Sequence, residues 1–436
     1  MKRSLLWVTV VAAVSGCGVA TATLGGELRA GAAKVSITPT PDQFPYTIGR
    51  ERSFVGVHDD VFARALVLDN GATRAVIVVA EVTAVPDARR IAEEVAQAAG
   101  VPTANVIVSA SHTHESLTVF IHGGELVPAQ LKEIEHVRAG AVEAARQAVA
   151  NLQPARIAYG RGEAFVNINN GEQAGLKTWY DARGPSDKTL GVVRVETASG
   201  AALALLVNYA THAETMFRSV VKDGGYLVTG DIPGAVSRIL EGSAAGAPVV
   251  VYMAGAEADQ LPLFKSLQPE AGGLPEADEG AGGFALLNVM ARRLSGSVLE
   301  TLGRMKPGAS DVALQVASST VTCPGQRVRV DNKTGEISKQ AGPPVAIPVS
   351  AIRINDIGIA AIGGDVGSDI GKAIRAGAAV PNMIVGTQMA GAVGYILSDA
   401  GYAHPGHGLG GSPLREGCAE QALTRGIARL LNAGPK

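Results

Sequence analysis

Several features that would assign a function directly are scarce or missing in this sequence. The formal net charge is −2 and no basic cluster is present, so nucleic acid is not an expected partner. No Gly-x-Ser-x-Gly elbow occurs, which excludes the usual serine hydrolase. Although only 4% of the residues are aromatic, 47% are hydrophobic, which is ample for one large core or two modest ones.

The apolar run near the amino terminus is too short to cross a membrane as a mature helix. This run, Leu5–Val14, follows Lys2 and Arg3. A short apolar stretch after basic residues is typical of a secretory signal peptide, here expected within residues 1–23.

The end of this leader resembles the lipobox of bacterial lipoproteins, Val14-Ser15-Gly16-Cys17. Cys17 would then be the lipidated first residue of the mature chain. The alternative is an ordinary signal peptide cut near Ala20–Thr23. Both readings predict an extracytoplasmic protein, either a periplasmic or outer-membrane (cell-surface) lipoprotein held at the membrane surface, or a secreted protein.

Cysteine is also scarce, since the chain has only three. Processing of the leader leaves Cys323 and Cys418 in the body of the protein. An even number of cysteines in an oxidising compartment permits one disulfide.

The rest of the chain alternates apolar strand patterns with helical periodicity. Asp69-Asn70-Gly71 between two such strands is a strong hairpin signal. The alternation indicates an α/β fold, with mixed sheets flanked by helices, and we expect a single domain over residues 31–436. The expected strands are Ala33–Thr38, Ala63–Leu68, Ala75–Ala80, Val106–Val108, Leu203–Tyr209, Pro248–Met253, Ile357–Ile362 and Met383–Met389; the expected helices are Asp87–Ala99, Gln130–Leu152 and Phe284–Leu302; residues 269–283 are expected to form a flexible surface excursion.

Two histidines follow the buried strand at Val106–Val108. Ligands in open α/β sheets gather beyond the carboxyl ends of strands, so His112 and His114 stand where chemistry is usually placed. On extended backbone, side chains at i and i+2 point the same way. One could bind a metal while the other faces a substrate; alternatively both are ordinary polar residues at a strand end.

Three further polar residues come just after apolar runs: His212, Asp365 and Tyr395. They lie far apart in the sequence and share no short zinc-binding spacing. Asp231 and Asp259 are expected to cap turns or to orient ligands. His404 and His407 are expected to be ordinary loop residues.

These motifs together resemble the N-terminal catalytic domain of the neutral/alkaline non-lysosomal ceramidases, from about Gly31 to about His404. The matching pieces occur in the order of that family across most of the chain. They are Ala33-Lys34-Val35-Ser36-Ile37-Thr38-Pro39, Gly56-Val57-His58-Asp59, Ala63-Arg64-Ala65, Ser111-His112-Thr113-His114, His212, Thr229-Gly230-Asp231-Ile232-Pro233-Gly234, Gly255-Ala256-Glu257-Ala258-Asp259-Gln260-Leu261-Pro262, Gly364-Asp365 and Gly394-Tyr395-Ile396.

The resemblance implies a zinc-dependent amidase that cleaves ceramide or a related N-acyl lipid by attack of zinc-bound water. The metal ligands it implies are His112, His212, Asp365 and Tyr395. His114 would contact the substrate and assist proton transfer, and Tyr402 corresponds to a second tyrosine near the scissile amide. Tyr395 would thus belong to both the metal site and the catalytic site.

The sequence departs from the family at several points. Asp365 stands where the family generally has glutamate, and Asn170 stands where it tends to carry a substrate-binding arginine. Glu115-Ser116-Leu117 replaces the usual turn after the second histidine. Because the sequence ends at Lys436, we expect no immunoglobulin-like domain of the kind that other members carry. Hydrolysis of another amide or an ester, or an inactive binding lipoprotein of the same fold, are the alternatives.

Replacing Cys17 with Ser tests the lipobox. A single acyl chain binds membranes only marginally, whereas several chains anchor stably. The wild-type protein should therefore fractionate with membranes, and Cys17→Ser should be released. Cell fractionation measures both, and wild-type protein that is already fully soluble outside the cytoplasm contradicts the lipobox.

Overall fold

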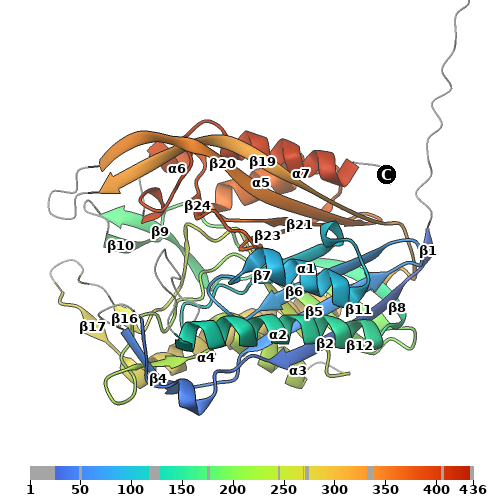
Figure 1. Ribbon diagram of the computed structural model, residues 1–436, viewed down its shortest axis with the longest axis horizontal. Coiled ribbons are helices and arrows are strands. Elements are labelled where there is room, and N and C mark those ends of the chain that lie inside the picture. The colour runs from blue at the N-terminus through green and yellow to red at the C-terminus, as the bar shows by residue number, and fades with distance from the viewer. Residues whose placement is uncertain are drawn as a thin grey trace, which may run out of the picture.

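The computed structural model describes residues 25–48, 52–116, 128–173, 177–243, 246–268, 270, 274–330, 337–403 and 407–432 (Figure 1). The predicted signal peptide, Cys17 and His404 lie outside the described residues. No helix in the described ranges is both long and apolar enough to span a membrane.

An eight-stranded mixed sheet forms the centre of the fold, in the order β14-β12-β11-β8-β2-β5-β6-β7. The pairs at its two ends, β6 with β7 and β12 with β14, are parallel, and the other pairs are antiparallel. The strands are β2 (Arg29–Ser36), β5 (Phe62–Asp69), β6 (Arg74–Ala80), β7 (Val106–Ala110), β8 (Gln153–Glu163), β11 (Thr189–Thr197), β12 (Ala202–Tyr209) and β14 (Val249–Ala254).

One half of this sheet is formed by β14, β12, β11 and β8, and the other by β2, β5, β6 and β7. The two halves pack face to face. Alternate residues of both halves, such as Leu66, Ile77, Leu206 and Val251, share one core cluster. The opposite residues of each half point outward to helices, as the two-residue period of a strand requires. The short β2–β8 pairing at Arg29 and Ala30 joins the two β layers.

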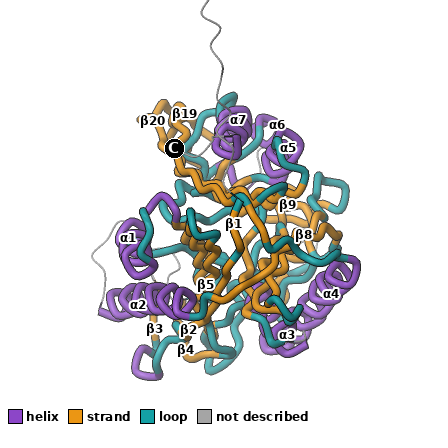
Figure 2. The backbone as a smooth tube through the Cα atoms, turned by 90° about the vertical axis from the view of Figure 1, so that its right-hand side faces the viewer, coloured by secondary structure: helices purple, strands orange, loops and turns teal. Residues whose placement is uncertain are grey.

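Two pairs of helices cover the outer faces of the halves, and Figure 2 shows the pairs on opposite sides of the strands. Helices α1 (Ala88–Ala99) and α2 (Pro128–Ala150) cover β5 to β7. Helices α3 (Asp231–Ser243) and α4 (Gly283–Arg304) cover β11, β12 and β14. The result is an α-β-β-α arrangement of layers.

A four-stranded sheet closes one side of these layers, at the top of Figure 1. One face, with Ile352 and Ile359, joins the core between the half-sheets. The other face packs against α5 and α7 through helix residues such as Ile370 and Leu423. The elements are β19 (Leu314–Val330), β20 (Ile337–Ile354), β21 (Ile357–Ile362), β23 (Asn382–Gly386), α5 (Ser368–Gly377) and α7 (Ala419–Asn432).

Short elements surround these sheets. They are β1 (Gly26–Glu27) with β18 (Asp311–Val312); β3 (Tyr46–Ile48), β4 (Arg52–Val57) and β13 (Tyr226–Val228); β9 (Asn167–Gln173), β10 (Lys177–Asp181) and β15 (Gln260–Pro262); β16 (Leu267–Gln268) with β17 (Ala277–Asp278); β22 (Asp365–Val366) with β24 (Tyr395–Ile396); and α6 (Asp399–Ala403). The described part of the 269–283 excursion is largely exposed and includes β17, which pairs with β16.

The predicted α/β class with mixed sheets is confirmed. The hairpin at Asp69-Asn70-Gly71 joins β5 to β6, and Gly100 ends α1 with a φ of +66°. The predicted strand Met383–Met389 is too long, because Thr387 turns away from β21. Its amide donates to the carbonyl oxygen of Ala254 (3.0 Å), and its hydroxyl donates to that of Gly255 (2.7 Å).

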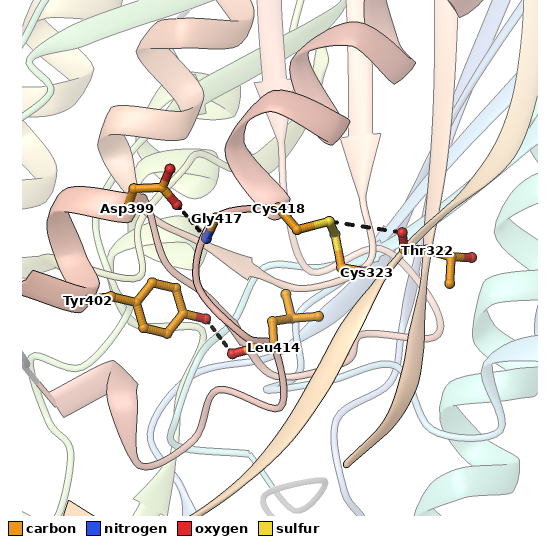
Figure 3. The surroundings of a disulfide bond; sticks show 7 residues. All are labelled: Thr322, Cys323, Asp399, Tyr402, Leu414, Gly417 and Cys418. Carbon is orange, nitrogen blue, oxygen red and sulfur yellow. Dashed lines mark hydrogen bonds between the residues drawn. A yellow bond between two sulfur atoms is a disulfide. The ribbon is translucent and has the colours of Figure 1, made fainter. Parts of the chain in front are cut away.

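The predicted pairing of Cys323 with Cys418 is confirmed: their sulfur atoms form a disulfide and their Cα atoms lie 5.8 Å apart (Figure 3). Cys323 belongs to β19, and Cys418 directly precedes α7. The bond therefore ties the last helix to the four-stranded sheet.

Removing this disulfide should destabilise the protein. Closing a separation of 95 residues contributes up to about 4–5 kcal/mol in the chain-entropy model. We expect Cys323→Ala/Cys418→Ala to unfold at a lower temperature than the wild type, measured by thermal unfolding. Thiol titration of the denatured, unreduced mature wild type should find no free thiol at these positions, and two free thiols would disprove the bond.

Candidate metal centre and active site

His112 stands where the chain leaves β7. Its φ of +65° shows that the backbone turns here, so the prediction of two histidines on extended backbone is wrong. The turn brings this segment beside the one after β12: Thr113 forms a parallel bridge with Ala213, and the His114 amide donates to the Ala213 carbonyl oxygen (3.0 Å). The ends of two distant strands therefore meet.

The ring of His112 is held by backbone. Its Nδ1 lies 2.7 Å from the carbonyl oxygen of Thr83, which can only accept, so Nδ1 is the donor. Nε2 is left to face a ligand. In metal-binding histidines, the ring nitrogen that does not bind the metal commonly donates such a hydrogen bond, which fixes the tautomer.

His212 is held in the same way. Its Nδ1 donates to the carbonyl oxygen of Glu257 (2.8 Å), and its amide donates to that of Gln260 (2.8 Å). Nε2 lies 3.2 Å from Oδ2 of Asp365. Burial acts to lower the pKa of His212, but the Asp365 carboxylate outweighs it and raises the pKa to about 10.

Asp365 and Tyr395 are brought together by strand pairing. They are register partners in the parallel pair β22–β24, and the Asp365 amide donates to the Gly394 carbonyl oxygen (2.9 Å). Burial raises the pKa of Tyr395 well above its usual value, and the negative charges of Asp365 and Glu214 raise it further. The phenol therefore lies within the field of the cluster's carboxylates.

The ligand atoms of these residues converge. Nitrogen atoms of His112, His114 and His212 lie within 4.8 Å of one another, and so do ligand atoms of His112, Glu257 and Asp365. All five residues are buried. Oδ1 of Asp365 and both carboxylate oxygens of Glu257 have no hydrogen-bond partner among the described residues. Buried, unpaired acceptors beside imidazoles are costly unless a cation binds them, so this donor set fits a metal ion.

His114 lies between the cluster and the ion pair of Glu214 with Lys265. Its Nε2 lies 3.2 Å from Nε2 of His112, and its Nδ1 lies 3.3 Å from Oε1 of Glu214. Oε2 of Glu214 accepts from the Lys265 ammonium (2.7 Å). Although burial acts to raise it, Lys265 and then the histidines hold the pKa of Glu214 well below its usual range. Burial lowers the pKa of His114, so its ring is neutral.

Tyr402 is placed differently from the other predicted site residues. Its hydroxyl donates to the carbonyl oxygen of Leu414 at 2.6 Å (Figure 3). It also lies 2.9 Å from the Ser412 hydroxyl. It packs with Leu397 and Leu409, and Tyr395 packs against this small cluster. Tyr402 thus belongs to the small cluster against which Tyr395 packs, and its hydroxyl is hydrogen-bonded to backbone.

The two aspartates expected to cap turns do so. Asp231 accepts from the amides of Ile232 (2.7 Å) and Met216 (3.1 Å). Asp259 accepts from both the amide and the hydroxyl of Ser368, at 2.7 and 2.8 Å. These bonds tie the segments after β12 and β14 to their neighbours.

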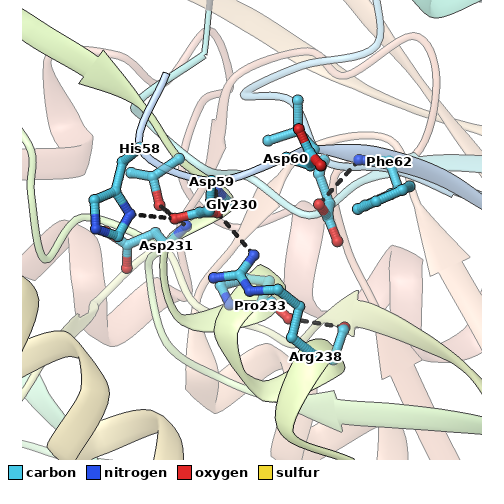
Figure 4. A network of polar contacts seen from close by, with 12 residues as sticks. His58, Asp59, Asp60, Phe62, Gly230, Asp231, Pro233 and Arg238 are labelled. Carbon is cyan, nitrogen blue, oxygen red and sulfur yellow. Dashed lines mark hydrogen bonds and ion pairs between the residues drawn. The ribbon is translucent and has the colours of Figure 1, made fainter. Parts of the chain in front are cut away.

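Two of the motifs behind the family resemblance contact each other (Figure 4). Asp59 lies 2.6 Å from the His58 ring, accepts from Thr229 and Gly230, and pairs with Arg238 of α3 at 2.7 Å. The His58 ring stacks on Phe284. This network holds α3 in place.

Glu257 is a member of the buried cluster that the sequence analysis did not name as a candidate site residue. It lies in the small-residue turn after β14, among residues without periodicity. The signal that could have found it is the rule applied to His112: an acid just past a buried strand at the carboxyl edge of the sheet.

Comparison with known proteins agrees with the fold and the resemblance. Residues 48–257 match the family model for the N-terminal part of neutral/alkaline non-lysosomal ceramidase. A crystal structure of neutral ceramidase from Pseudomonas aeruginosa has a TM-score of 0.70 at 17% identity, covering 93% of this chain and 74% of that one. A ceramidase complexed with C2 has a TM-score of 0.72 at 17% identity, covering 93% and 75%. No curated protein matches the sequence.

The protein therefore has the fold of the neutral ceramidases, a class of hydrolases. The match of residues 48–257 to the family model and the shared fold confirm the resemblance to the neutral/alkaline non-lysosomal ceramidases. His112, His114 and His212 lie within the matched residues, which end at Glu257, whereas Asp365 and Tyr395 lie beyond them.

Single replacements of the histidines test their separate roles. His112→Ala and His212→Ala should lose metal and activity together, because a catalytic zinc has few protein ligands to spare. His114→Ala should keep its metal and lose rate by roughly 10²–10⁴-fold, as for a general acid or base. Metal analysis and turnover are measured on each variant.

His136→Ala is the control, because His136 lies on α2 outside the cluster. It should keep both metal and activity. A His112→Ala variant that binds zinc and turns over at the wild-type rate would overturn the assignment of the site.

Proposed function

We propose that this protein is an extracytoplasmic, zinc-dependent hydrolase of an N-acyl amide bond, acting on ceramide or a related N-acyl lipid. The observation that carries the proposal is the buried convergence of three histidines with Asp365 and Glu257. The family match implies a hydrolase, and an unactivated amide is a bond for which a metal centre is suited.

His112, His212, Asp365 and Tyr395 are proposed to hold the ion. When bound, Zn²⁺ polarises a carbonyl group and lowers the pKa of a bound water to about 7. The backbone acceptors Thr83 and Glu257 fix which nitrogen of each ring faces the site. The two imidazoles are thereby oriented before any ligand arrives.

His114 is proposed to hold and move a proton at Nε2. Glu214 lies beside its Nδ1 and is itself held by Lys265, so the ring is oriented from the side opposite the cluster. Phe217 meets the His114 ring edge to face at a centroid distance of 5.0 Å and restricts it further. A neutral, oriented imidazole can accept a proton and return it to the leaving amine.

The remaining parts of the proposal concern the substrate and the cellular location. Tyr402 is proposed to stand near the scissile amide, which is supported by its place in the small cluster against which Tyr395 packs. The chain from residue 31 is proposed to act as one catalytic domain, anchored by a lipidated Cys17. Another amide or an ester remains the second candidate substrate, because Asn170 replaces the substrate-binding arginine of the family.

Metal removal and a substrate panel test the function. Purified protein should contain about one Zn²⁺ per chain. It should hydrolyse members of a panel of N-acyl amides with different head groups, lose this activity on chelation, and regain it with Zn²⁺. Product release is measured by chromatography.

The control is chelated protein returned to buffer without metal, which should stay inactive. A matched series of esters distinguishes the second candidate substrate. Protein free of zinc that turns over no amide or ester would instead support a binding lipoprotein, and full activity in metal-free protein would refute the metal mechanism.

A further inference from the structure

Glu257 is fixed in place by the turn that carries it. The turn joins β14 to β15, and Glu257's own carbonyl oxygen accepts from the Gln260 amide (2.7 Å) as well as from His212. The next residue, Ala258, donates to the carbonyl oxygen of Val366 in β22 (3.1 Å). One short segment is therefore bonded to both the His212 segment and the strand of Asp365.

The first residue of this turn, Gly255, is packed so tightly that no side chain would fit there. A Cβ atom added at Gly255 would lie 2.7 Å from the backbone nitrogen of Ala210. The turn thus lies directly against the segment that leads to His212. Glu257 has a defined position relative to the cluster rather than the freedom of a surface acid.

Among the described residues, no hydrogen-bond partner accounts for the burial of the Glu257 side chain. It is 0% exposed, and both carboxylate oxygens lack a hydrogen-bond partner in the part of the chain that the structure describes. A ligand oxygen of Glu257 lies within 4.8 Å of the ligand atoms of His112 and Asp365. Burial of a carboxyl group without a partner is unfavourable, so a partner is expected.

The charges of the neighbouring acids favour a divalent partner. Glu214 is balanced by Lys265 at 2.7 Å. Metal ligands bind in their deprotonated form, with histidine neutral, so the carboxylates of Asp365 and Glu257 would together bring two negative charges to a bound ion. Two charges in a buried site match one divalent cation.

We propose that Glu257 is a direct ligand of the same metal ion as His112, His212 and Asp365, so that two carboxylates bind it. This inference rests on the proposed function. Asp365 has one methylene fewer than the glutamate usual at its position, and Glu257 supplies a second carboxylate from a different turn. The centre then has one more acidic donor than the resemblance alone implies.

Glu257→Gln tests this ligand with a metal-binding readout. The substitution keeps the shape of the side chain and removes its charge, so the variant should fold. We expect its Zn²⁺ affinity, measured by competition with a chromogenic chelator, to fall by roughly 100-fold or more, because loss of an outer partner alone costs about 10–100-fold. The visible spectrum of the Co²⁺-loaded variant should differ from that of the wild type, because a direct ligand has changed.

Two further variants complete the experiment. Glu257→Asp keeps a carboxylate and should bind Zn²⁺ more tightly than Glu257→Gln. Asp259→Asn replaces a partly buried carboxylate in the same turn, where Ser368 is a partner, and should leave the Co²⁺ spectrum unchanged. Circular dichroism checks the folding of every variant.

The outcomes separate this inference from the proposed function. If the Zn²⁺ affinities of the wild type and Glu257→Gln differ by less than about 100-fold, or if their Co²⁺ spectra agree, Glu257 is not a direct ligand, while the proposed metal centre is unaffected. If the wild type binds no Zn²⁺, the proposed function fails, and this inference fails with it.

Discussion

The face-to-face packing of the two half-sheets is the constraint on which the rest of the structure depends. Each half contributes alternate aliphatic residues to one shared core and turns the others toward its own pair of helices. The packing places the end of β7 against the end of β12, where Thr113 bridges Ala213. Without it, His112 and His212 would lie in distant parts of one long sheet.

Charge is the second constraint, because the cluster gathers ionisable groups that are all buried. Glu214 has Lys265, and the rings of His112 and His212 each have a backbone acceptor. Asp365 and Glu257 are acids of the cluster whose oxygens are not all satisfied within the described chain. The fold thus holds acceptors close together, a pattern more common in binding and catalytic sites than in cores.

Much of the fold and the site could be predicted because strands and strand ends leave clear patterns. His112, His212, Asp365 and Tyr395 each follow an apolar run, and the structure brings their segments close together. Helix α3 was not predicted, since its first turn contains Pro233 and Gly234 and reads as a loop. The contact of Tyr402 with Leu414 depends on tertiary packing that no local pattern records.

The position of the four-stranded sheet has a consequence for the order in which the protein folds. Asp365 follows β21 of this sheet, and Tyr395 comes after β23 of the same sheet. His112 and His212 instead follow strands of the two half-sheets. The donors therefore belong to three separate layers, and they meet only after all three have docked. An ion bound by all of these donors would hold the three layers together. It could bind fully only after the layers have docked, so metal binding would stabilise the completely folded protein.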